Sequence, residues 1–213
     1  GDNAGTTVCG NWIHDVVGYP YSDADSCGFY TDEGSHGILF ATNLVERCPG
    51  VAVNHHYGRD VTFANNIFSG FRTCGVSRVR EEGHPTIRVV NNVFLWDDSS
   101  ASAYRMGSAP AKIGDLSANG NVYWCTSGVT GKSFYGSDWL GWQALGKDSG
   151  SVIADPLFMN ARGGDWRLKE GSPARTCGFV PFDWTRAGVD RRDSRWAAIA
   201  DETTWAEPES VVK

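Results

Sequence analysis

The sequence has no run of about 18 apolar residues, so nothing in it predicts a membrane-spanning helix. It also has no basic clusters, and its net charge is −6, which argues against nucleic acid or an anionic membrane as a partner. The six cysteines form no Cys-x-x-Cys pair, and no His stands two to four residues from a Cys, so a zinc site is not predicted. Disulfides in an exported protein and buried thiols both fit this cysteine pattern.

Hairpin dipeptides are nearly absent too, since Asn119-Gly120 is the one Asn-Gly pair, and this disfavours a β-sandwich. What the sequence does have is 41% apolar residues, 26 glycines and an internal repeat. An apolar strand, an Asn and a second apolar strand recur at residues 38–45, 61–68, 87–94 and 116–123, with a weaker copy at 8–13. Repeats of this length are typical of solenoids, in which each coil buries its inner face against its neighbours.

The repeat therefore predicts an all-β fold, a right-handed parallel β-helix with one short helix and an irregular C-terminal tail. Residues 1–188 are expected to form the coils, as the C-terminal part of a longer solenoid, and residues 189–213 the tail. The anchoring asparagines are spaced by 23, 26 and 29 residues, and because Asn tolerates a left-handed backbone and bonds to its like, we expect a ladder from coil to coil. The ladder residues are Asn43, Asn66, Asn92 and Asn121. Residues 137–145 interrupt the pattern and predict the helix, capped by Ser137 or Asp138.

Several blocks, in order, resemble right-handed β-helix proteins that include glycoside hydrolases of the fucosidase and xylanase type. The blocks are Asp32-Glu33-Gly34-Ser35, His55-His56-Tyr57-Gly58, Arg80-Glu81-Glu82-Gly83-His84, Ala154-Asp155-Pro156-Leu157-Phe158 and Gly171-Ser172-Pro173-Ala174. This resemblance covers residues 8–188 and implies a secreted or cell-surface protein that acts on a polysaccharide. It also implies coils that precede the first one, so we expect a preceding segment, a second chain or residues 186–213 to cover the exposed edge of that coil.

Stacking the coils predicts a polar patch. We align them on Gly28, Gly50 and Gly75, each of which precedes a strand. This alignment sets Asp32 beside Asn54 and Val79, Glu33 beside His55 and Arg80, and His56 beside Glu81. Adjacent strands lie about 4.8 Å apart, so the patch would hold carboxylates at the spacing of glycoside hydrolases, about 5–9.5 Å.

The predicted catalytic carboxylates and the predicted substrate-binding residues all lie on this patch or at its rim. The catalytic candidates are Asp32, Glu33, Glu81 and Glu82, and the binding candidates are His55, His56, Arg80, His84 and Asp97. Crowded carboxyls push their pKa values apart, so one can stay protonated as the acid while the other is ionised.

Three functions remain open at this point. The first is a glycoside hydrolase with paired carboxylates and no cofactor. The second is a polysaccharide lyase, which abstracts a proton with Lys, Arg or Tyr and often uses calcium; the scarcity of Lys in the patch disfavours it. The third is a non-catalytic β-helix that binds glycan or builds a surface assembly.

Overall fold

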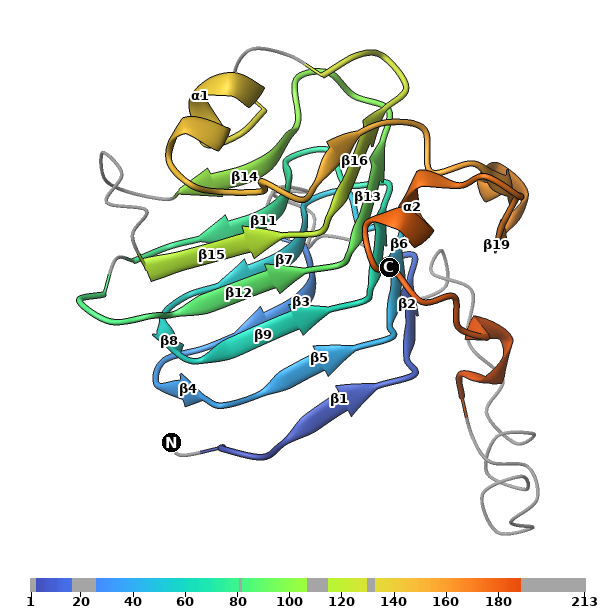
Figure 1. Cartoon of the computed structure of the whole chain (residues 1–213). Coiled ribbons are helices and arrows are strands. Elements are labelled where there is room, and N and C mark those ends of the chain that lie inside the picture. Colours follow the sequence, from blue (N-terminus) through green and yellow to red (C-terminus); the bar gives the residue numbers. More distant parts are fainter. Residues whose placement is uncertain (1–2, 17–25, 81, 107–114, 130–132, 189–213) are drawn as a thin grey trace, which may run out of the picture.

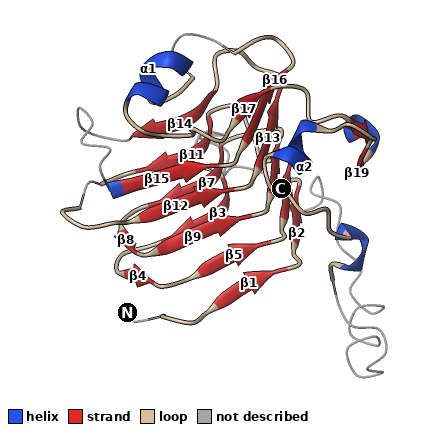
Figure 2. Cartoon of the chain, in the orientation of Figure 1, coloured by secondary structure: helices blue, strands red, loops and turns tan. Residues whose placement is uncertain are grey.

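The computed structural model describes residues 3–16, 26–80, 82–106, 115–129 and 133–188. Three parallel sheets run along a solenoid, and each complete coil gives one strand to each sheet (Figure 1). Strands dominate the described chain and helices are few and short (Figure 2). The predicted parallel β-helix is therefore confirmed.

Sheet A and sheet B meet at the Asn bends, and sheet C follows sheet B in each coil. Sheet A contains β1 (Thr7–Cys9), β5 (Leu39–Ala41), β9 (Val61–Ala64), β12 (Ile87–Val90) and β15 (Leu116–Asn119). Sheet B contains β2 (Trp12–His14), β6 (Leu44–Glu46), β10 (Ile67–Ser69), β13 (Val93–Trp96), β16 (Val122–Cys125) and β17 (Val152–Ile153). Sheet C contains β3 (Cys27–Thr31), β7 (Val51–His55), β11 (Cys74–Arg78) and β14 (Ser102–Met106). The short strands β4 (Ser35–His36) and β8 (Gly58–Arg59) pair in the turns between sheets C and A.

The interior is filled by aromatic side chains that stack from coil to coil. Phe40 and Phe63 are register partners with ring centroids 4.6 Å apart, and Phe94 stacks on Tyr123 at 5.1 Å. In-register stacking of like residues follows from parallel pairing, because each strand repeats the inward positions of the strand before it. This core fixes the register of the turns that leave it.

The Asn ladder forms as predicted and includes the weaker copy at Asn11. The Oδ1 atom of Asn43 accepts hydrogen bonds from the backbone N of Asn11 at 3.0 Å and from its Nδ2 at 2.8 Å. The same pair of bonds joins Asn43 to Asn66, Asn66 to Asn92 and Asn92 to Asn121, at 2.9 to 3.1 Å. Buried amides satisfied in this way fix the bend of every coil.

The left-handed residue of each bend is not the ladder asparagine but the residue before it. Positive φ angles occur at Gly10, Thr42, Asn65, Asn91 and Gly120, between 54° and 68°. The ladder side chain can therefore point along the stack while its predecessor turns the chain. The expectation that the ladder Asn itself takes the left-handed conformation was wrong.

A buried carboxylate ends the ladder. Asp148 accepts hydrogen bonds from Asn121 Nδ2 at 3.0 Å, Tyr123 OH at 3.0 Å and Trp142 Nε1 at 2.7 Å, and also from the Ser151 hydroxyl. Trp142 lies in α1 (Trp139–Ala144), the predicted helix, whose N-cap is Asp138 rather than Ser137. The helix thus supplies a lid for the last ladder rung.

The chain after Ile153 leaves the three sheets and packs on the outer face of sheet B. It forms the antiparallel pair β18 (Phe158–Asn160) and β19 (Asp165–Leu168), the 3-10 turns η3 (Ala161–Gly163) and η4 (Trp184–Arg186), and a second helix, α2 (Pro173–Thr176). The expectation of one helix was wrong, although Ser172 followed by Pro173 is a helix-start signal. The predicted tail at 189–213 lies outside the described residues.

All six cysteines are described, and none forms a disulfide. Burial raises the pKa of the Cys48 thiol to about 11 and that of Cys74 to about 12, which makes both poor nucleophiles. The alternative of buried thiols therefore holds for Cys48, Cys74 and Cys125, whereas Cys9 is exposed and Cys27 and Cys177 are partly exposed. Neither described helix is long enough to span a membrane.

Candidate functional site

The turns after β3, β7 and β11 carry the predicted patch, but their register differs from the predicted one. Gly28 and Gly75 lie on either side of Ala52, and neither lies beside Gly50. The predicted alignment of the middle coil is therefore wrong by two residues. A Cβ at Gly28 would meet a Val45 methyl at 2.4 Å. The glycine at this position therefore reflects tight internal packing. In the middle coil the equivalent position is occupied by Ala52.

The corrected register moves His55 into the interior. It lies between Thr31 and Arg78, is fully buried, and its Nδ1 is 2.7 Å from the Thr31 hydroxyl. Burial, with the neighbouring Arg78 charge second, lowers the pKa of His55 to about 4. Its Nε2 has no hydrogen-bond partner among the described residues. His55 thus lies beneath the predicted patch and does not face the solvent with it.

On the outer side of the same turns, two carboxylates meet one imidazole. His56 Nδ1 lies 3.0 Å from Asp32 Oδ1 and 3.8 Å from Glu33 Oε1. The hydrogen bond from His56 lowers the pKa of Asp32, so this carboxyl stays ionised at neutral pH. Both acidic side chains are well exposed, and His56 is largely covered.

The next coil adds a cation and a third carboxylate. The Arg80 guanidinium lies 4.2 Å from the centre of the Tyr57 ring, and Arg80 Nη2 lies 3.6 Å from Glu82 Oε1. Glu82 Oε2 is 3.8 Å from His84 Nε2. The Tyr57 ring lies edge-on to the His56 ring, with the centroids 5.3 Å apart, and desolvation, with the nearby Glu33 carboxylate second, raises the pKa of the phenol. A continuous network thus joins Asp32 at one end to His84 at the other.

A hollow of about 290 Å³ opens beside this network. Its lining comes from the turns between sheets C and A: Gly34, His36, Tyr57, Gly58, Arg59, Glu82 and His84. The Glu82 side chain is only 20% exposed, and its Oε1 is buried without a hydrogen-bond partner among the described residues. It is the least solvated carboxylate of the patch.

An ion pair that sequence reasoning missed supports the patch from below. Arg78 and Asp115 are both buried and form a salt bridge. Asp115 Oδ2 also accepts a hydrogen bond from the Glu82 backbone N at 3.2 Å, which anchors the turn. Strand alternation could have identified the inward position of Arg78, because the core residue Val76 lies two positions earlier.

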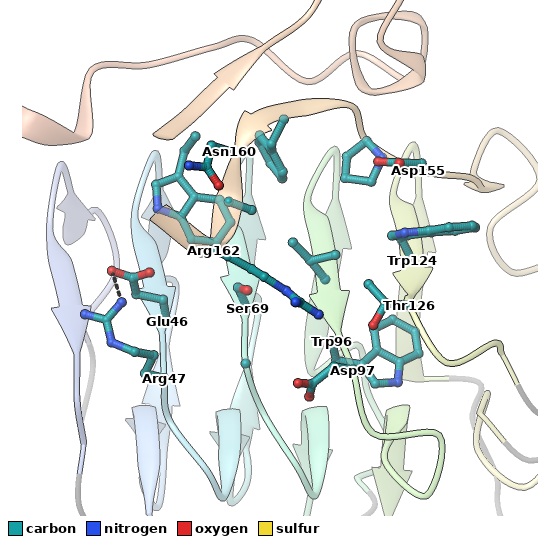
Figure 3. A pocket seen from close by; sticks show the side chains of 16 residues that line it. Glu46, Arg47, Ser69, Trp96, Asp97, Trp124, Thr126, Asp155, Asn160 and Arg162 are labelled. Carbon is teal, nitrogen blue, oxygen red and sulfur yellow. Dashed lines mark ion pairs between the residues drawn. The ribbon is translucent and has the colours of Figure 1, made fainter. Parts of the chain in front are cut away.

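One predicted residue lies apart from this group, and another is not described by the structure. Asp97 follows β13 and borders a separate cavity of about 330 Å³ on the outer face of sheet B (Figure 3). Glu81 lies outside the described residues. The described part of the chain contains no cluster of three side chains that could hold a metal ion.

No protein-family model matches the chain, and no curated protein or solved structure matches it either. The fold therefore supports the β-helix part of the resemblance, and no comparison supports the hydrolase part.

Proposed function

We propose that the chain is a carbohydrate-active protein that cleaves glycosidic bonds at the patch around Tyr57. The observation that carries the proposal is the placement of Glu33 and Glu82, from different coils, around Tyr57: Glu33 lies 3.8 Å from His56, whose ring contacts Tyr57, and Glu82 lines the open hollow with Tyr57. Glycoside hydrolysis needs two carboxyl groups on either side of the scissile bond, one protonated and one ionised. Stacked coils are a simple way to place two such groups in one site.

The environments of the carboxylates suggest different roles. Glu82 lines the hollow and its side chain is 20% exposed, so Glu82 is the proposed general acid. Glu33 is exposed and is the proposed base or nucleophile. Asp32 keeps its charge and holds His56 in place between the two coils. Arg80 fixes Tyr57 and has donors for sugar hydroxyls.

The test is a screen of plant and algal polysaccharides for reducing-end release, followed by Glu33→Gln and Glu82→Gln. Each substitution should reduce cleavage by about 100-fold or more, since an acid or base contributes about 10² to 10⁴ in rate. Glu170→Gln is the matched control, because Glu170 is exposed on the turn after β19. Equal activity of all three variants would refute the assignment.

A lyase is the second candidate, and one contact favours it. Arg80 over Tyr57 is a pairing that could serve proton abstraction beside a uronate carboxyl. The raised pKa of Tyr57 opposes this role, because the phenol stays protonated at neutral pH. Calcium-stimulated release of an unsaturated, ultraviolet-absorbing product that persists in Glu82→Gln and is lost in Tyr57→Phe would favour the lyase.

Coverage of the first coil and a secreted or cell-surface location are parts of the same proposal. Strands β1, β2 and β3 each end their sheet, and Trp12 of β2 is 40% exposed there. Open sheet edges promote association, so a preceding segment or a second chain is the proposed cover. Sedimentation of the isolated chain should show self-association, and a monodisperse monomer would contradict the proposal.

A further inference from the structure

The outer face of sheet B has two rows of side chains, an apolar row and a mixed row that borders a cavity. Leu44, Ile67, Val93 and Val122 form an apolar row that packs against Phe158, Trp166, Ala174 and Phe179 of the C-terminal segment. The next outward row contains Glu46, Ser69, Leu95 and Trp124. This second row forms the floor of the 330 Å³ cavity, and residues 155–166 form its rim.

One buried hydrogen-bond donor at this cavity has no acceptor among the described residues. Trp166 packs on the outer face of sheet B, lines the cavity and is 4% exposed, and its Nε1 has no hydrogen-bond partner among the described residues. Buried donors are normally satisfied, so the Trp166 indole indicates a place for a ligand with acceptor oxygens. Trp96 also borders the cavity, but its ring belongs to the interior of the solenoid, where it stacks on Phe71.

Of the two arginines that line the cavity, one is held in ion pairs and the other extends across the cavity. Arg47 is held by Glu46, at 2.7 Å, and by Asp15, which fixes one end of the cavity. Arg162 extends from η3 across the cavity toward Asp97, and no ion pair of Arg162 is drawn (Figure 3). Donors from Arg162 and acceptors from Asp97 thus face the same space as the partly exposed ring of Trp124.

We propose that this cavity is a saccharide-binding site, separate from the patch around Tyr57, that takes one neutral pyranose unit of a glycan. The ligand class rests on the proposed carbohydrate function, whereas the location rests on the cavity itself. Three carboxylates, of Glu46, Asp97 and Asp155, face two guanidinium groups, so the lining does not select an anionic sugar. The apolar face of a pyranose suits Trp124, and its hydroxyls can accept from the Trp166 indole and donate to Asp97.

The volume fits this occupant. A cavity of about 330 Å³ lies at the lower end of the range for ligand sites, roughly 300 to 1,000 Å³, and has room for a short saccharide. A longer glycan would continue past Arg162 into solvent. The site would hold substrate near the molecule while the patch acts on another part of the same polymer, which raises its effective concentration.

The test uses ¹⁵N-labelled Glu82→Gln protein titrated with cellohexaose, xylohexaose and mannohexaose. The indole N–H signals of Trp124 and Trp166, assigned with single Trp→Phe variants, should shift saturably with at least one of the three sugars. The signal of Trp184, which is partly exposed in η4 outside this cavity, should not move. Arg162→Ala should weaken the fitted affinity about fivefold, and this exposed side chain is not needed for folding.

Two results would overturn the inference: no saturable shift with any of the three sugars, or saturable shifts that leave the indoles of Trp124 and Trp166 unmoved. The outcome is separate from that of the hydrolase proposal. Wild-type cleavage without cavity shifts would remove the second site alone, whereas cavity shifts without wild-type cleavage would remove the hydrolase alone.

Discussion

The chain bends in each coil both at the Asn position between sheets A and B and at the turn after sheet C. The two bends differ in whether the same residue recurs from coil to coil. The Asn bend uses the same residue in five successive coils, and Asn43, Asn66, Asn92 and Asn121 are fully buried. Two residues past the paired positions Thr31, His55 and Arg78, the turn after sheet C has Glu33, Tyr57 and Arg80, which are three different residue types. One bend repeats its chemistry and the other varies it.

Hydrogen bonding explains the difference. A buried bend must satisfy its backbone and side-chain groups within the protein, and a stacked amide does so with the identical amide of the next coil. The turn after sheet C is open to water, which satisfies its polar groups in any arrangement. The constraint that made the first bend easy to recognise is absent from the second, and this freedom is why a site can be built there.

The largest effect is expected when one rung of the ladder is removed. In Asn66→Ala, Asn66 Oδ1 no longer accepts from the N and Nδ2 of Asn43, and Asn66 Nδ2 no longer donates to Phe40 O or Asn92 Oδ1. At about 1 kcal/mol for each hydrogen bond, the free energy of unfolding should fall by about 4 kcal/mol. Urea denaturation followed by circular dichroism measures it.

Asn54→Ala is the control, because Asn54 is half-buried on β7 and has no place in the ladder. Its loss should cost less than about 1 kcal/mol. Equal costs for the two variants would mean that the ladder adds nothing beyond an ordinary polar contact.

The ladder and the patch also differ in how far the sequence predicts them. The Asn spacing located every rung, and the break at 137–145 located α1. The patch was predicted in the correct turns but in the wrong register, because glycines can mark either a bend or a tight inner contact. Ala52 shows that the inner contact also accepts a methyl group, so glycine alone could not set the alignment.

The inner residues were the hardest to predict. His55 stands two residues after the core residue Val53, so alternation at the end of β7 predicted it inside, against its grouping with His56. Nothing in the sequence linked Arg78 to Asp115 or Asp148 to Asn121, because these partners are 37 and 27 residues apart. Long-range polar pairs without a repeat leave no local pattern.

Beneath the patch, His55 should make the fold sensitive to acid. Its pKa of about 4 lies below the ordinary value of about 6.5, so the unfolded chain binds a proton that the folded chain does not. The free energy of unfolding should therefore fall as the pH drops from 6.5 to 4, by about 3 kcal/mol from this residue. Urea denaturation across this window, compared between wild type and His55→Gln, isolates the contribution.

In His55→Gln the side chain cannot be protonated, so the pH dependence should become shallower even if the variant is less stable at pH 7. Parallel pH profiles of the two proteins would show that the acid sensitivity comes from other groups. The contribution of His55 to the free energy of unfolding would then be independent of pH, as is that of the ladder amides.

A smaller effect is expected at the left-handed position of the Asn bend. Thr42 takes a φ of 54°, which a β-branched residue adopts at a cost, whereas the equivalent positions in two following coils are Asn65 and Asn91. Thr42→Asn should raise the free energy of unfolding by about 1 kcal/mol, because Asn tolerates this conformation. Thr62→Asn, on β9 without a positive φ, is the control and should not stabilise.

The smallest change in stability is expected at the patch itself. Glu33 is well exposed, and its 3.8 Å contact with His56 is a surface ion pair, which contributes about 0 to 1 kcal/mol. Glu33→Gln should therefore shift the urea midpoint very little, while Asn66→Ala in the same assay shifts it strongly. If Glu33→Gln destabilised the fold as much as the loss of a rung, the outer turn would be part of the framework. Its variation from coil to coil could then no longer be attributed to freedom from structural demands.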